Sequence, residues 1–73
     1  MAKDYTNTVF YIGKDDSIIY TVLRKDAFKY VIERKIFVLG INETIISVKR
    51  SIIHYSKKYL SFLLQCNNVT IVD

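Results

Sequence analysis

The sequence contains little of what small domains commonly use to stabilise a fold. Its 73 residues include one cysteine, one histidine, and no proline or tryptophan. A single cysteine excludes an intrachain disulfide, and one cysteine with one histidine is too few for a zinc site built on thiolates and imidazoles. Because a domain of this length buries only about 60% of its unfolded surface, we expect self-association to supply further stability.

Long apolar runs are also absent. The longest, IFVLGI at residues 36–41, spans six residues, whereas a membrane-spanning helix needs roughly 20. The first eight residues, MAKDYTNT, lack the apolar stretch of a secretion signal. We therefore expect an intracellular, cytoplasmic protein with a reduced cysteine and no membrane partner.

The chain does contain many apolar residues and an excess of positive charge. Hydrophobic residues make up 51% of the sequence, enough for a core and a partner surface, and the formal net charge is +4. Segment 44–60 holds Lys49, Arg50, Lys57 and Lys58 without any acid. A surface of one charge sign attracts polyanions, although such residues also occur on ordinary solvated surfaces. The abundance of Phe, Tyr, Ile, Asn and Lys indicates an AT-rich genome, viral genomes included.

The apolar pattern predicts three strands that alternate with two helices. Residues 7–12, 36–41 and 69–72 have the β-branched and aromatic composition of strands. The stretch from about residue 15 to 33 has apolar residues at helical spacing, with Asp15 and Asp16 as N-terminal caps. A second helix is predicted from about residue 44 to residue 62 or 64. The order β-α-β-α-β over a single domain, residues 1–73, predicts an α/β (α+β) fold, a small two-layer sandwich with helices over a sheet.

The second predicted helix carries two apolar seams. One contains Ile45, Val48, Ile52, Tyr55 and Tyr59, and the other contains Ile46, Ile53 and Leu60 at seven-residue spacing. A helix that packs only on its own sheet needs one stripe, so the second seam predicts a homodimer interface at Ile46, Ile53 and Leu60. The alternative is a single wide apolar face wrapped by loops.

The order of these landmarks resembles that of the Alba family, small archaeal chromatin and RNA-binding proteins. The matching features are a strand ending in Ile12-Gly13-Lys14, a helix, an apolar strand, and a helix opening Thr44-Ile45-Ile46-Ser47, spread over residues 8–60. The resemblance implies a dimer that lies along a nucleic acid, with Lys14 at the phosphate-facing position. Two family features are missing, because loop 40–43 carries no basic residue and no basic hairpin arm follows residues 69–72.

Six residues are candidate nucleic-acid contacts: Lys14, Asn42, Lys49, Arg50, Lys57 and Lys58. The five cations would neutralise phosphates. Asn42 would hydrogen-bond a base edge or a ribose hydroxyl, or else cap the second helix. Asp15 and Asp16, which follow Lys14, would repel an anion and count against this contact. They are interpreted as caps rather than as a catalytic pair, because a pair of catalytic carboxylates would need a concave pocket.

The sequence has no constellation typical of an enzyme. It contains no Gly-rich phosphate loop, metal cluster or nucleophile beside a base, so we expect no catalysis, cofactor, metal or small-molecule substrate. The first hypothesis is a small dimeric protein that binds DNA or RNA with low sequence specificity. The alternative is an Alba-like interaction module, encoded by a virus or plasmid, that has lost nucleic-acid binding and acts through protein partners.

Overall fold

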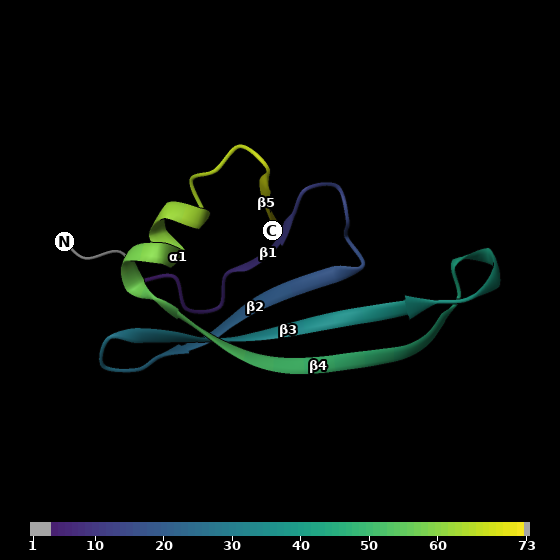
Figure 1. The fold of residues 1–73 in the computed structure, drawn as a ribbon, viewed down its shortest axis with the longest axis horizontal. Helices are drawn as coiled ribbons and strands as arrows, with labels where there is room; N and C mark the ends of the chain where they lie inside the picture. Colours follow the sequence, from purple (N-terminus) through teal and green to yellow (C-terminus); the bar gives the residue numbers. More distant parts are fainter. Residues whose placement is uncertain (1–3, 73) are drawn as a thin grey trace.

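Strands, rather than helices, make up most of the molecule. The computed structural model describes residues 4–72, in the order β1 (Val9–Ile12), β2 (Ile18–Lys25), β3 (Lys29–Leu39), a 3-10 turn η1 (Ile41–Glu43), β4 (Ile45–Ser56), α1 (Lys57–Leu63) and β5 (Val69–Val72) (Figure 1). The fold is thus a small, sheet-rich α+β fold. Residues 1–3 of the segment considered for a secretion signal, and residue 73 of the expected domain, lie outside the described residues.

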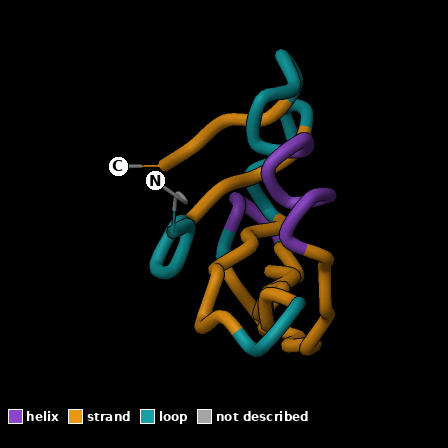
Figure 2. The backbone as a smooth tube through the Cα atoms, turned by 90° about the vertical axis from the view of Figure 1, so that its left-hand side faces the viewer, coloured by secondary structure: helices purple, strands orange, loops and turns teal. Residues whose placement is uncertain are grey.

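The five strands form one sheet in the order β4-β3-β2-β1-β5, and every neighbouring pair is antiparallel. Strands β1 to β4 therefore follow one another as a meander, and β5 returns to pair with β1, with Phe10 opposite Ile71. This arrangement leaves β4 and β5 as the two edges. In Figure 2, viewed along the long axis, the helix lies beside strands seen end on.

The first predicted helix is wrong, because residues 18–39 form the β2–β3 hairpin. Its turn is closed by two backbone hydrogen bonds between Asp26 and Lys29, of 2.7 and 3.2 Å. The helical stripe read along this segment competes with an alternation of period two, which includes Tyr20, Val22, Tyr30 and Ile32. Tyrosine and β-branched residues favour strands, and the structure buries Val22, Tyr30 and Ile32 of the alternating set, together with Val31.

The second predicted helix is mostly wrong as well. Residues 45–56 form the long strand β4, and only residues 57–63 are helical. Along the inner half of β4, Ser51, Ile53 and Tyr55 are half-buried while the residues between them are exposed, which is the period-two pattern of a strand. Isoleucines seven positions apart share a helix face but lie on opposite faces of a strand. The predicted β-α-β-α-β order is therefore not the observed one.

The three predicted strands are confirmed, with different lengths. Strand β1 covers residues 9–12 of the predicted 7–12, and β5 matches residues 69–72. The apolar run that begins at Ile36 is the end of an eleven-residue strand, β3.

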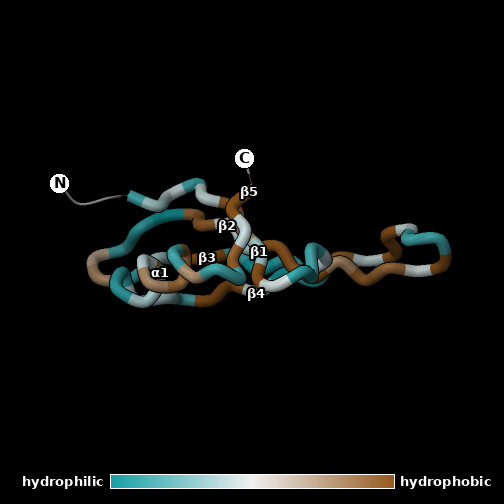
Figure 3. The backbone as a smooth tube through the Cα atoms, turned by 90° about the horizontal axis from the view of Figure 1, so that it is seen from above, coloured by the Kyte–Doolittle hydropathy of each residue, from teal (hydrophilic) through white to brown (hydrophobic). Residues whose placement is uncertain are grey.

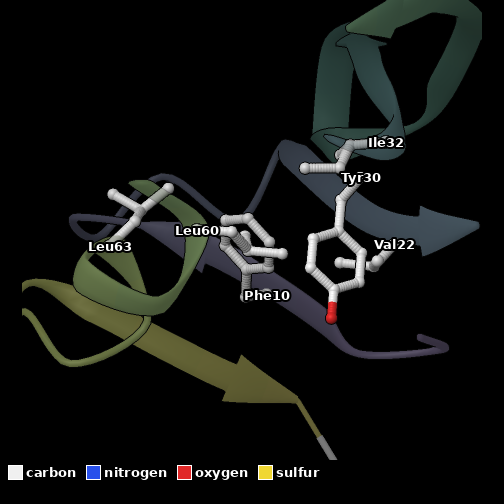
Figure 4. Close-up of a cluster of buried hydrophobic side chains, with 6 residues drawn as sticks. All are labelled: Phe10, Val22, Tyr30, Ile32, Leu60 and Leu63. Atoms are coloured by element: carbon white, nitrogen blue, oxygen red, sulfur yellow. The ribbon is translucent and has the colours of Figure 1, made fainter. Parts of the chain in front are cut away.

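The core lies between the inner half of the sheet and α1. Its buried members are Phe10, Val22, Tyr30, Ile32, Leu60 and Leu63 (Figure 4). Aromatic contacts extend this cluster: the Phe10 ring stacks on Tyr20 with centroids 5.0 Å apart, and Tyr5 meets Tyr30 edge to face at 6.0 Å. The Tyr30 hydroxyl also accepts a 3.3 Å hydrogen bond from the Tyr5 backbone N–H. This core is small and stands at one end of an elongated molecule.

Candidate nucleic-acid interface on the β3–β4 ribbon

The two longest strands extend well beyond the core. We call β3, β4 and the connecting residues 40–44 the ribbon. Its ladder runs from Lys29 opposite Ser56 to Leu39 opposite Ile45, and beyond Ile36 the only ladder neighbour of β3 is β4. The molecule therefore measures 46 × 24 × 17 Å, and the ribbon forms its projecting end (Figures 1 and 3). All residues from 41 to 50 are exposed.

The ribbon and the start of the helix carry the positive charge of the protein. Residues 29–58 contain seven lysines and arginines but only two acids, Glu33 and Glu43, for a net charge of +5. Since the whole chain has a net charge of +4, the remaining residues together carry −1. A polyanion would therefore approach the ribbon face of the molecule first.

Four cations gather at one level of the ribbon. The register places Lys35 directly opposite Arg50, Ile36 opposite Lys49, and Arg34 opposite Ser51. We call Arg34, Lys35, Lys49 and Arg50 the basic band. Because side chains alternate along a strand, Lys35 and Arg50 share one face, whereas Arg34 and Lys49 share the other. Like charges that face each other across a ladder destabilise a sheet, so this arrangement favours a bound anion.

Acids neutralise little of the basic band. The Nζ of Lys35 lies 3.4 Å from the Oε1 of Glu33, and both side chains are partly exposed. Within residues 4–72, Lys49 and Arg50 form no ion pair, and all side chains from residue 41 to 50 face solvent. The band therefore keeps most of its charge for an external partner.

Arg34 stands out within the band because part of its guanidinium is buried. The Nε atom has no hydrogen-bond partner among residues 4–72, and an unmatched buried donor costs about 1–3 kcal/mol. The register places Tyr20 beside Arg34 in β2. Burial raises the pKa of the nearby Tyr55 hydroxyl, as do Tyr20 and Tyr59, while the charge of Arg34 opposes the rise. Tyr55 therefore keeps its proton at neutral pH and remains a donor beside the band.

Lys57 and Lys58 lie apart from the band, at the beginning of α1. Ser56 caps this helix by accepting a 3.1 Å hydrogen bond from the N–H of Tyr59. The neighbouring Lys25 lowers the pKa of Lys57, because its side chain disfavours a second ammonium group beside it. The first turn contains no acid, so two lysines add to the positive end of the helix dipole. These lysines form a second basic region at the core end of the ribbon.

The other two candidate contacts lie in turns. Lys14 is exposed and follows Gly13, whose φ of 71° opens the β1–β2 turn. The carboxylate of Asp15 accepts hydrogen bonds from the N–H and the hydroxyl of Ser17, which lower the pKa of Asp15. Asp15 therefore stabilises this turn, and the prediction that it caps a helix is wrong.

Asn42 lies at the tip of the ribbon, where no helix follows it. Its φ of 60° is left-handed, a conformation that asparagine tolerates well, so its predicted alternative role as a helix cap is wrong. Glu43, beside it, has the same φ. Gly40 keeps the tip tight, because a Cβ there would lie 3.0 Å from the Cγ2 of Ile46.

The distal half of the ribbon carries apolar and acidic groups. A shallow hollow of about 310 Å³ is lined by Asp16, Ser17, Phe37, Leu39, Glu43 and Ile45. At the tip itself, Ile41 is 87% exposed. The carboxylates would repel phosphate, which limits a nucleic-acid interface to the basic band and the core end.

The structure separates the three residues predicted to form a dimer seam. Ile46 is 66% exposed on the distal ribbon, Ile53 packs against the edge of the core, and Leu60 is fully buried in the core. The helical seam that would join them does not exist, because two of them lie on opposite faces of β4. Leu60 has no surface to offer a partner.

Sequence reasoning missed Arg34 and Lys35. Both follow directly after the first predicted helix in the sequence, whereas the register brings them across from Ser51 and Arg50. The detectable signal was a pair of β-branched segments separated by the turn residues Gly40 and Asn42, which is typical of a hairpin.

Within residues 4–72, no three His, Cys, Asp or Glu side chains gather as a metal ion would require. The same residues include no helix with the length and apolarity needed to cross a membrane. No family model, curated protein or solved structure matches the chain.

Proposed function

We propose that this protein binds nucleic acid through the phosphate backbone, without strong sequence preference, and that the basic band is its main contact surface. The observation that carries the proposal is the ladder register, which gathers Arg34, Lys35, Lys49 and Arg50 at one level of a projecting ribbon. Contacts between cations and phosphates supply the sequence-independent part of nucleic-acid affinity.

The shape of the ribbon supports the same conclusion. Cations occur on both faces of the ribbon, so either face can contact a phosphate backbone. Arginine and lysine side chains would also reach the phosphates of a single strand or of RNA.

The proposal does not depend on the resemblance to Alba proteins. That resemblance used two long helices, and the segments concerned form β2, β3 and β4 instead. Membership of the Alba family and its two-layer sandwich remain a hypothesis without support from the observed order of elements. The basic band stands on the register alone.

The test is an electrophoretic titration with duplex DNA and with RNA at several salt concentrations. If all four cations contact phosphate, the logarithm of the association constant should fall against the logarithm of salt with a slope of about −3 to −4. Absence of any shift at about 50 mM salt, where electrostatic binding is strong, would refute the proposal.

A matched pair of variants distinguishes binding at the basic band from a general effect of net charge. Arg50→Gln should weaken binding and reduce the salt slope by about one. Arg24→Gln lowers the net charge equally, but Arg24 lies off the ribbon with its Nε 3.4 Å from Asp26, so it should bind like the wild type. Equal losses of affinity in both variants would mean that net charge, and not the basic band, determines binding.

A second candidate function is an interaction module that acts through a protein partner. The specific observation in its favour is the distal ribbon, where Leu39, Ile41, Ile45 and Ile46 are exposed beside the carboxylate of Glu43. In that case Ile41→Ser would abolish partner capture and leave nucleic-acid binding unchanged.

A further inference from the structure

Strand β4 is an unpaired edge of unusual length. It has twelve residues, and within residues 4–72 its only ladder neighbour is β3. Long exposed edges template pairing with another chain, and proteins usually shield them with proline, bulges or charge. Strand β4 has no proline, its register shift against β3 is confined to the outer end at Ile46, and its cations Lys49 and Arg50 stand between apolar residues on both sides. Ile46, Val48 and Ile52 are all exposed.

We propose that a second copy of this chain pairs with β4, antiparallel, about a two-fold axis at Ser51, which joins the two sheets into one. This inference goes beyond nucleic-acid binding and does not depend on it. The two-fold axis makes the contact isologous, so each copy satisfies the edge of the other and the assembly closes as a dimer.

The register follows from the residues on β4. A two-fold axis perpendicular to the sheet keeps every side chain on its own face, so opposed residues must be an even number of positions apart or identical. An axis at Lys49 or Arg50 would place that cation opposite itself, which is destabilising. An axis at Val48 pairs only residues 45–51, because β4 begins at Ile45, and it leaves Ile52 and Ile53 without a partner.

An axis at Ser51 avoids these conflicts. It pairs residues 47–55 with their counterparts, which leaves out the register shift of β4 at Ile46, and it places Lys49 opposite Ile53 and Arg50 opposite Ile52 of the other copy. The aliphatic stems of lysine and arginine cover such residues while their charged ends remain in water. No cation then faces a cation, and the exposed isoleucines of both copies gain neighbours.

A second copy is also the occupant that the rest of the fold favours. The fully buried side chains are few and lie at one end of the molecule, so the ribbon gains little support from its own core. The opposite edge, β5, has only four residues. Pairing through β4 therefore gives the longest continuous ladder that two copies can form from their free edges.

Cysteine cross-linking tests this register directly. In a Cys66→Ser background, Ser51→Cys places two thiols on the axis, where facing Cα atoms lie about 4.5–5.5 Å apart and a disulfide can form. Ser47→Cys is the matched control on the same strand. The register places residue 47 opposite residue 55 of the other copy. The two introduced cysteines are then eight positions, or about 27 Å, apart along the strands, which is too far for a disulfide.

Mild oxidation without nucleic acid should convert Ser51→Cys to a covalent dimer and leave Ser47→Cys monomeric on a non-reducing gel. Equal linking of both variants, or no linking of Ser51→Cys, would overturn the proposed register. Sedimentation of the wild-type protein should report twice the 8.6 kDa mass of one chain. A single-chain mass at about 100 μM would overturn the dimer itself.

Charge substitution provides a second test that does not rely on cysteine. Ile52→Lys would place a lysine opposite Arg50 of the other copy, and the two-fold axis repeats this contact. The dissociation constant of the dimer should therefore rise at least about tenfold. Ile52→Gln has no charge to repel either that arginine or Glu33, which lies opposite residue 52 in β3 of the same chain, and should remain dimeric. Dissociation of both variants to the same extent would overturn the pairing of residues 50 and 52.

The control for these charge variants is on the other edge. Ile71 lies on β5 and is 49% exposed, close to the 54% of Ile52. Ile71→Lys should therefore leave the dimer intact. If Ile71→Lys dissociates the dimer and Ile52→Lys does not, the second copy occupies β5 and the proposal is wrong. Because binding of nucleic acid is measured separately, failure of one proposal does not imply failure of the other.

Discussion

Replacing Leu60 by alanine tests the core directly. Leu60 lies on α1, which carries only one other buried residue, Leu63. Its side chain is fully buried against the cluster that includes Phe10 and Tyr30. The substitution removes three carbon atoms and leaves a cavity between the helix and the sheet.

The expected loss is a large part of the total stability. Leucine-to-alanine changes in cores cost about 2–5 kcal/mol, and the cost falls when the surroundings can settle into the cavity. Helix α1 has seven residues and packs on one side of the sheet, so partial settling is expected and the loss should be about 3 kcal/mol. A domain of this length has a free energy of unfolding of about 4–11 kcal/mol.

The assay is urea unfolding followed by far-UV circular dichroism, with Phe62→Ala as the control. Phe62 lies on the same helix and is 67% exposed, so its removal should change the free energy of unfolding by no more than about 0.5 kcal/mol. In thermal unfolding, the Leu60→Ala loss should lower the Tm by about 12–24 °C.

Two outcomes would refute this reasoning. A loss below about 1 kcal/mol, or one equal to that of Phe62→Ala, would mean that α1 does not cover the sheet as described. Association shifts apparent stability by mass action. If the loss of free energy of unfolding depends on protein concentration, Leu60 lies in an interface between chains, as the predicted helical seam implied.

Two smaller predictions concern caps and turns. Ser56→Ala removes the acceptor for the Tyr59 N–H and should lower the free energy of unfolding by about 1 kcal/mol, whereas the exposed Ser47→Ala should have no effect in the same urea assay. Ser17→Ala should raise the pKa of Asp15 towards its ordinary value in an NMR titration, since Ser17 supplies the hydrogen bonds that lower it. Because folding lowers this pKa, the carboxylate stabilises the protein above the pKa of the unfolded chain, and the contribution disappears as pH falls through the folded value. Ser17→Ala should therefore flatten this acid dependence, and an unchanged Asp15 titration would contradict the assignment.

Sequence reasoning succeeded where a segment was short and had one possible period. Residues 9–12 and 69–72 are β-branched or aromatic throughout, and turn residues such as Gly13 and Asn68 bound them. It failed where two periods coexist. In residues 45–60, isoleucine and tyrosine positions satisfy both helical spacing and strand alternation, and strand β3 beside them decides the outcome.

The candidate site was predictable only in part. Lys49 and Arg50 were recognised from charge alone, because charge is visible without the fold. Arg34 and Lys35 join them only through pairing across the ladder, which depends on the register between two segments about 15 residues apart. Leu60 was assigned to a dimer interface because it follows Ile46 and Ile53 at seven-residue spacing. Its burial depends on the packing of the short helix α1 against the sheet, which the sequence pattern does not show.

The pairing of β1 with β5 has a consequence for synthesis on the ribosome. Val9 pairs with Val72, which lies 63 positions later in the sequence, so β1 waits for a distant segment before its second neighbour exists. Strands β2, β3 and β4 can pair as soon as each is made, because their partners are adjacent in sequence. A nascent chain therefore displays the finished ribbon before the helix covers the apolar face beneath it. During that interval the exposed apolar face makes the growing polypeptide prone to aggregation.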